Sequence, residues 1–159
     1  MTIHAWRIVK AKHASTAFSG DGSNKYGARW NSPGAAVVYV ASSTSLTMLE
    51  RLVHFQSSKE LLYHYVLFEV IFDEMLMTVA DVATLPKTWR ESPPAPALQQ
   101  LGDAWIASAA SAILCVPSAI VSSEWNYLFN PAHPDFQQIT IGPQQPILFD
   151  PRLIKPTAL

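Results

Sequence analysis

The segment that decides the fold reads Gly27-Ala-Arg-Trp-Asn-Ser-Pro-Gly34, continues as Ala35-Ala-Val-Val-Tyr-Val-Ala41, and reaches Leu46-Thr-Met-Leu-Glu-Arg-Leu-Val-His54. The first part is a loop rich in glycine and proline, and the small and β-branched residues 35–41 predict a strand. Apolar residues at helical spacing predict a helix over 44–56, which the side-chain oxygens of Ser42-Ser43-Thr44 can cap. This quarter of a charge-poor chain also holds an arginine, a tyrosine and a glutamate.

The remaining segments predict an α+β domain with a mixed or antiparallel β core flanked by helices. Strands are expected over 3–9, 61–72, 112–116, 137–142 and 146–149, a helix over 96–110, and a short helical turn over 123–129. Residues 19–28 are expected to be a loop, and prolines make 81–96 irregular. A chain of 159 residues can bury a substantial core, so residues 1–159 are expected to form a single domain.

Charge and composition argue against several classes of protein. The chain has 11 Lys and Arg against 12 Asp and Glu, whereas direct nucleic-acid binding needs a basic surface. We expect neither nucleic-acid nor membrane binding and a cytoplasmic location, because no signal-peptide core and no apolar run near the roughly 20 residues of a membrane span is visible. Charged residues are 14% of the chain against 49% hydrophobic, so an exposed apolar interface for a protein partner is expected.

Several kinds of site lack the necessary motifs. The five histidines are scattered, without a His-Glu-x-x-His or Cys-x-x-Cys pattern, so no metal site is expected. Ser19-Gly-Asp-Gly22 has neither the Walker lysine nor the dinucleotide glycine spacing, and no Gly-x-Ser-x-Gly elbow is present. The lone Cys115 is expected to be a buried strand residue.

Arg29, Tyr39 and Glu50 remain as candidate site residues. A guanidinium in a loop of glycine and proline is suited to binding phosphate, and a tyrosine at a strand end offers a stacking surface. Glu50 lies at the edge of the buried stripe of its helix, where a carboxylate can stabilise positive charge during bond breaking. Structural roles stay open, because Arg29 could tie down its loop, Tyr39 could be a core residue, and Glu50 could pair with His54.

A wider set of motifs resembles the RES domain, the toxin of RES-Xre toxin–antitoxin systems. The motifs cover nearly the whole chain and are Gly-Ala-Arg29-Trp-Asn-Ser-Pro-Gly, Val-Val-Tyr39-Val-Ala-Ser-Ser, Leu-Glu50-Arg-Leu-Val-His54, Val-Pro-Ser118-Ala-Ile-Val and Asn126-Tyr-Leu-Phe-Asn130-Pro-Ala-His133-Pro. The dispersed arginine, glutamate and serine of the family name match Arg29, Glu50 and Ser118, while the literal tripeptide at 90–92 is coincidental. Ser122 stands where the family commonly has a proline.

The resemblance implies an ADP-ribosyltransferase-like fold and an enzyme that cleaves NAD at the nicotinamide–ribose bond, with NAD as substrate and not as cofactor. Attack by water would make it a glycohydrolase and attack by phosphate a phosphorylase, whereas a protein acceptor would make it an ADP-ribosyltransferase. An RNA-directed toxin and a silent nucleotide-binding module are the remaining alternatives. The implied partner is a cognate Xre-type helix-turn-helix antitoxin that covers the active site.

The resemblance also implies a role for each of the candidate site residues. Glu50 would stabilise an oxocarbenium-like ribose, and Arg29 would hold the NAD pyrophosphate. Tyr39 would stack on the nicotinamide or the ribose, and Ser118 would hydrogen-bond a phosphate or a ribose hydroxyl. Together these four residues are the expected catalytic set. Further candidates for the substrate pocket are Trp30 and Asn126.

Overall fold

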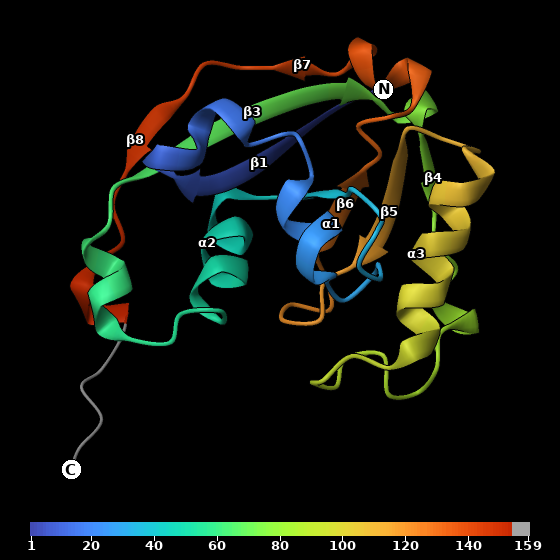
Figure 1. Ribbon diagram of the computed structural model, residues 1–159, viewed down its shortest axis with the longest axis horizontal. Coiled ribbons are helices and arrows are strands. Elements are labelled where there is room, and N and C mark those ends of the chain that lie inside the picture. The colour runs from blue at the N-terminus through green and yellow to red at the C-terminus, as the bar shows by residue number, and fades with distance from the viewer. Residues whose placement is uncertain (154–159) are drawn as a thin grey trace.

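A curled, mixed β-sheet organises the computed structural model, which describes residues 1–153 (Figure 1). Its strands run in the order β4-β5-β6-β2-β1-β3-β7, with β8 also paired to β3. The β4–β5 pair is parallel and the other pairs are antiparallel, in agreement with the expected α+β class. The strands are β1 (Thr2–Lys10), β2 (Val38–Ala41), β3 (Tyr65–Asp73), β4 (Met77–Val79), β5 (Ile113–Pro117), β6 (Trp125–Phe129), β7 (Thr140–Ile141) and β8 (Gln145–Ile147).

Within residues 1–153 three α-helices flank the sheet, and Figure 1 shows α3 alongside β5 and α2 below β1. The helices are α1 (Asp21–Tyr26), α2 (Thr44–Leu52) and α3 (Pro96–Ser108). Short 3-10 turns η1 to η6 cover Ala11–Thr16, Ser58–Leu62, Glu74–Leu76, Val82–Thr84, Pro134–Gln138 and Pro151–Leu153. None of the helices within residues 1–153 has the length and apolar character needed to cross a membrane.

Two apolar clusters fix the positions of the longer helices. Leu98 and Trp105 of α3 pack with Leu114 of β5 and Leu128 of β6, while α2 packs on a cluster around Ile8 of β1. Burying such side chains contributes about 1.5–3 kcal/mol each. Helix α3 therefore covers the β5–β6 side of the sheet, and α2 covers the β1–β3 side.

The start of α2 confirms the expected cap. Ser43 is the N-cap residue, and its hydroxyl accepts a 3.0 Å hydrogen bond from the backbone N–H of Leu46. Leu46 is fully buried and anchors the first turn, so Glu50 follows one turn later on nearly the same face. The helix ends at Leu52 and not at 56, because the backbone N–H of Phe55 turns back to the carbonyl of Leu52 in a tighter turn.

The sheet opens between β1 and β2, which pair through Trp6 and Ala41, whereas β1 and β3 pair along their whole length. Arg7 is half-buried beside this opening and donates to the carbonyls of Tyr39 at 2.8 Å and Ala17 at 2.7 Å. Burial lowers the pKa of Arg7 to about 10, and the nearby cation of Arg51 adds to the effect. The opening thus holds a partly desolvated positive charge.

Two expectations were wrong about the type of element. The expected loop 19–28 contains α1, which begins after Gly20, whose φ of 74° places it in the left-handed region. The expected helical turn over 123–129 is instead strand β6, because this segment completes hydrogen-bond ladders with both β2 and β5. Neighbouring strands therefore overrode a local pattern that is ambiguous in sequence.

Other expectations were right about the element and wrong about its bounds. The expected strand 35–41 begins at Val38, and 61–72 divides into η2 and β3. The expected strand 137–142 is shortened by η5 to β7, whereas β1, α3, β5 and β8 lie close to their expected positions. Cys115 is a buried residue of β5. The expected domain 1–159 includes residues 154–159, which lie outside the described residues.

Candidate active site

Glu50 is the centre of a polar cluster that joins α2 to the ends of β5 and β6. Its Oε1 accepts a 2.9 Å hydrogen bond from the hydroxyl of Ser118 and a 2.6 Å bond from the side-chain amide of Asn126. Both donors are buried, with Ser118 fully inaccessible, whereas Glu50 keeps partial exposure. No hydrogen bond within residues 1–153 ends on Oε2, so this oxygen is available to a ligand.

The hydroxyl of Ser118 makes all its hydrogen bonds within the protein. It donates to Glu50 and accepts from the backbone N–H groups of Ile120 and Val121, both at 3.1 Å. One donor and two lone pairs are all that a serine hydroxyl has. This arrangement favours a role in orienting Glu50 over the direct contact with phosphate or ribose expected from the sequence.

Arg29 lies on the loop after α1, where its Nη1 donates to the backbone carbonyls of Trp89 at 3.1 Å and Glu91 at 2.7 Å. Burial lowers the pKa of Arg29, and the negative charge of Glu50 partly offsets this effect. The two side chains therefore attract one another, although they form no ion pair among the described residues. Within the same residues Nε and Nη2 make no hydrogen bond, which leaves two donors for an anionic ligand.

Tyr39 of β2 fixes the loop that carries Arg29. Its hydroxyl donates to Oδ1 of Asn31 at 2.6 Å and accepts from the backbone N–H of Trp30 at 3.3 Å. Burial raises the pKa of Tyr39 above the usual value of 10.0. Trp30 itself is 2% exposed and packs with the α3 cluster, so its ring serves as an anchor for the loop.

Helix α3 supplies supports for this loop that the sequence patterns did not reveal. Gln99 donates to the carbonyls of Ala28 and Asn31, and Asp103 accepts from the backbone N–H of Ser32 at 2.9 Å. Between them, Gly102 approaches so closely that an added Cβ would lie 1.6 Å from the carbonyl oxygen of Trp30. Polar and small residues on one face of an otherwise apolar helix were the only sequence signal.

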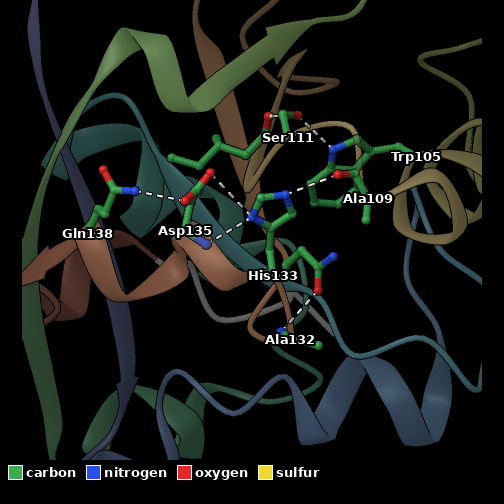
Figure 2. Close-up of polar contacts among 9 residues, drawn as sticks. Trp105, Ala109, Ser111, Ala132, His133, Asp135 and Gln138 are labelled. Atoms are coloured by element: carbon green, nitrogen blue, oxygen red, sulfur yellow. Dashed lines mark hydrogen bonds and ion pairs between the residues drawn. The ribbon is translucent and has the colours of Figure 1, made fainter.

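Two histidines of the sequence motifs lie apart from the Glu50 cluster. The side chain of His54 is exposed at the end of α2. His133 accepts at Nδ1 from the backbone N–H of Asp135, so its proton lies on Nε2, which donates to the carbonyl of Ala109 at 3.0 Å (Figure 2). Figure 2 also shows Trp105 bonded to Ser111, so this second cluster ties the end of α3 to the sheet.

The geometry can be compared with known proteins. The model of the RES domain family matches residues 4–150. The chain belongs to the RES family. This confirms the resemblance drawn from the motifs around Arg29, Glu50 and Ser118.

Curated relatives of this RES chain are named as toxins. The Prs ADP-ribosylating toxin of Sphingobium sp. is 40% identical over 160 residues, which cover 98% of this chain and 99% of the relative. The Toxin Res of Yersinia enterocolitica is 38% identical over 150 residues, which cover 93% and 97%. Both relatives align over almost their full length.

A solved structure supports the fold. A chain of the crystal structure of the M. tuberculosis MbcT-MbcA toxin-antitoxin complex matches this RES chain with a TM-score of 0.74 and 19% identity. The match covers 96% of this chain and 87% of that chain. The expected α+β architecture is therefore confirmed.

Proposed function

We propose that this RES protein is a toxin that cleaves NAD at the bond between nicotinamide and ribose. The observation that carries the proposal is the Glu50 carboxylate, which Ser118 and Asn126 hold through one oxygen while the other stays available. The names of its relatives as toxins, one of them ADP-ribosylating, support the same conclusion.

In the proposed reaction the negative charge of Glu50 stabilises the positive charge that develops on the ribose. The bond between C1′ of the ribose and the nicotinamide nitrogen breaks, and its electron pair leaves with nicotinamide. Positive charge develops on the ribose, where the Oε2 side of Glu50 stabilises it. A nucleophile then attacks C1′, and water as nucleophile gives ADP-ribose.

Arg29 is the proposed binding group for the pyrophosphate. Its free Nε and Nη2 donors match two phosphate oxygens, and its attraction to Glu50 indicates that the two groups face the same region. Tyr39 holds the loop of Arg29 through Asn31 and so fixes the distance between cation and carboxylate. Phosphates bound to Arg29 would keep the ribose beside Glu50 in the ground state and in the transition state alike.

A second candidate function is transfer of ADP-ribose to a protein. The Sphingobium relative, named an ADP-ribosylating toxin, favours this alternative. Both functions break the same bond and differ in the nucleophile, which is water or phosphate in one case and a protein side chain in the other.

We also propose an antitoxin of the Xre type as partner. The structural neighbour comes from a toxin-antitoxin complex, and apolar residues lie near Glu50 on α2 and at its C-cap. Leu49 is 37% exposed and Val53 is 59% exposed. A partner that buries these side chains would also cover the Glu50 carboxylate.

The test is nicotinamide release from NAD by the purified chain, with the products resolved by mass spectrometry. We expect release by the wild type and its loss in Glu50→Gln, which keeps the size of the side chain and removes its charge. Glu69→Gln is the matched control, because Glu69 lies on β3 and contacts His4. ADP-ribose, ADP-ribose phosphate or a modified protein would identify the acceptor.

Two results would contradict the proposal. One is a folded Glu50→Gln variant that releases nicotinamide as fast as the wild type. The other is a folded wild-type chain that leaves NAD intact with water, phosphate and cell extract all offered as acceptors. Thermal unfolding of each variant separates loss of the site from loss of the fold.

A further inference from the structure

The segment 86–91, here called the strap, connects η4 to α3 and runs between the two sides of the candidate site. Lys87, Thr88, Arg90 and Glu91 are exposed, and Trp89 packs against the cluster that contains Leu98. Within the strap, the backbone N–H of Trp89 donates to Pro86 and that of Glu91 donates to Thr88. These local turns give the strap its shape but do not tie it to the sheet.

Two arginines add polar connections to the packing of Trp89 on the cluster that includes Leu114 and Leu128. Arg29 reaches the strap from one side and donates through Nη1 to the carbonyls of Trp89 and Glu91. Arg90 leaves the strap on the other side and donates through Nε to the carbonyl of Ala119 at 3.2 Å and through Nη2 to that of Ile120 at 3.4 Å. The strap therefore bridges the loop of Arg29 and the turn that follows Ser118.

The turn after Ser118 is the firmer of the two attachments. The backbone N–H of Ser118 donates to Glu124, and that of Glu124 donates to Val121. The buried hydroxyl of Ser118 accepts from Ile120 and Val121 and donates to Glu50. This turn is thus braced by buried hydrogen bonds, whereas the strap is held by the packing of Trp89, by Arg29 and by its own exposed Arg90.

From this asymmetry we infer that Arg90 is a positioning residue, which fixes the strap to the turn 119–120 and thereby sets the place of Arg29 opposite Glu50. Only the kinetic test of this inference rests on the proposed NAD cleavage. Nη1 of Arg29 is hydrogen-bonded to the strap. Movement of the strap would therefore turn the guanidinium and redirect the Nε and Nη2 donors that are proposed to bind phosphate. The inference therefore assigns a function to Arg90, an exposed arginine that the sequence motif did not include.

The kinetic consequence distinguishes this role from a merely structural one. Because Arg29 would bind the phosphates in the ground state and in the transition state alike, its displacement weakens binding without slowing bond breaking. We expect Arg90→Ala to raise the KM for NAD about tenfold, with kcat within about twofold of the wild type. Arg90→Lys should restore little, because an ammonium group cannot span two carbonyls as the guanidinium fork does.

The experiment measures kcat and KM for NAD in the full chain and in these two variants, with Lys87→Ala as the control. Lys87 is an exposed cation on the same strap, so its loss changes the charge and leaves the bridge in place. Wild-type KM in a folded Arg90→Ala variant would overturn the inference. A fall in kcat at unchanged KM would overturn it as well, because Arg90 would then act through Glu50.

Amide hydrogen exchange separates failure of this inference from failure of the proposed function. If Arg90 holds the strap, exchange at Trp89 and Glu91 accelerates in Arg90→Ala and stays at the wild-type rate in Lys87→Ala. Absence of NAD cleavage by the wild type would contradict the proposed function, and the exchange rates would still test the anchoring of the strap. Unchanged exchange in Arg90→Ala would overturn the inference whichever reaction the protein performs.

Discussion

The Glu50 cluster and the His133 cluster both join a helix to the end of the sheet, but they differ in how completely their polar groups are paired. In the His133 cluster both ring nitrogens have partners, the carbonyl of Ala109 and the backbone N–H of Asp135 (Figure 2). In the Glu50 cluster a carboxylate is held through one oxygen, beside a guanidinium that attracts it without contact. A closed network stabilises a fold, whereas charged groups with free donors and acceptors can bind and react.

The difference follows from what each cluster is built from. The ring of His133 pairs with a backbone carbonyl and a backbone amide, which need partners wherever they are buried. The Glu50 cluster uses the side chains of Ser118 and Asn126 to hold another side chain. Holding a carboxylate so firmly restricts its motion, and this is the preorganisation that electrostatic catalysis requires.

The largest expected effect is that of Glu50→Gln on NAD cleavage. Removing the charge while keeping the shape should lower kcat by about 10²–10³-fold, the range seen when one electrostatic contact to a transition state is lost. Thermal unfolding should stay near that of the wild type, because the amide can still accept from Ser118 and Asn126. Equal turnover would place the reacting centre elsewhere.

Ser118→Ala should have the next largest effect. Loss of the hydroxyl removes one of the two donors to Glu50 and leaves the backbone N–H groups of Ile120 and Val121 without their acceptor. We expect kcat to fall about tenfold and the free energy of unfolding to fall by about 1–3 kcal/mol. Steady-state kinetics and denaturant unfolding measure the two changes. Unchanged turnover would remove Ser118 from the site.

Tyr39→Phe tests the support of Arg29. Asn31 is fully buried and would lose its donor, so the free energy of unfolding should fall by about 1–3 kcal/mol, with a smaller effect on turnover than Ser118→Ala. The pKa of Tyr39 is higher in the folded chain than its usual value of 10.0, so the wild type loses stability as pH rises above about 10. Denaturant unfolding between pH 8 and pH 11 should show a shallower loss in the variant.

His133→Ala should change turnover least. The variant loses the bonds to Ala109 and Asp135 at the end of α3, so we expect the free energy of unfolding to fall by about 1–2 kcal/mol. The KM and kcat for NAD should remain within about twofold of the wild type. A large loss of turnover in a folded variant would erase the distinction between the two clusters.

Much of the local structure could be predicted from residue patterns. Ser43 and Leu46 define the start of α2 as expected, but the buried stripe expected beside Glu50 is limited to the first turns, because Leu49 and Val53 are 37% and 59% exposed. The motif residues Arg29 and Ser118 were also found from the sequence. By contrast, β6 was expected to be a helical turn, because its strand character depends on β2 and β5, which are distant in sequence.

The sequence by itself determined the family, the α+β class and the residue types of the site, because capping, periodicity and motif spacing are properties of short segments. Only the tertiary structure decided that Ser118 and Asn126 hold the same oxygen of Glu50, and that Arg29 is bonded to the strap. These contacts join residues 60 to 76 positions apart, and packing of the sheet and helices brings them together. The chemistry of the site was thus visible in the residues, and its geometry came from the fold.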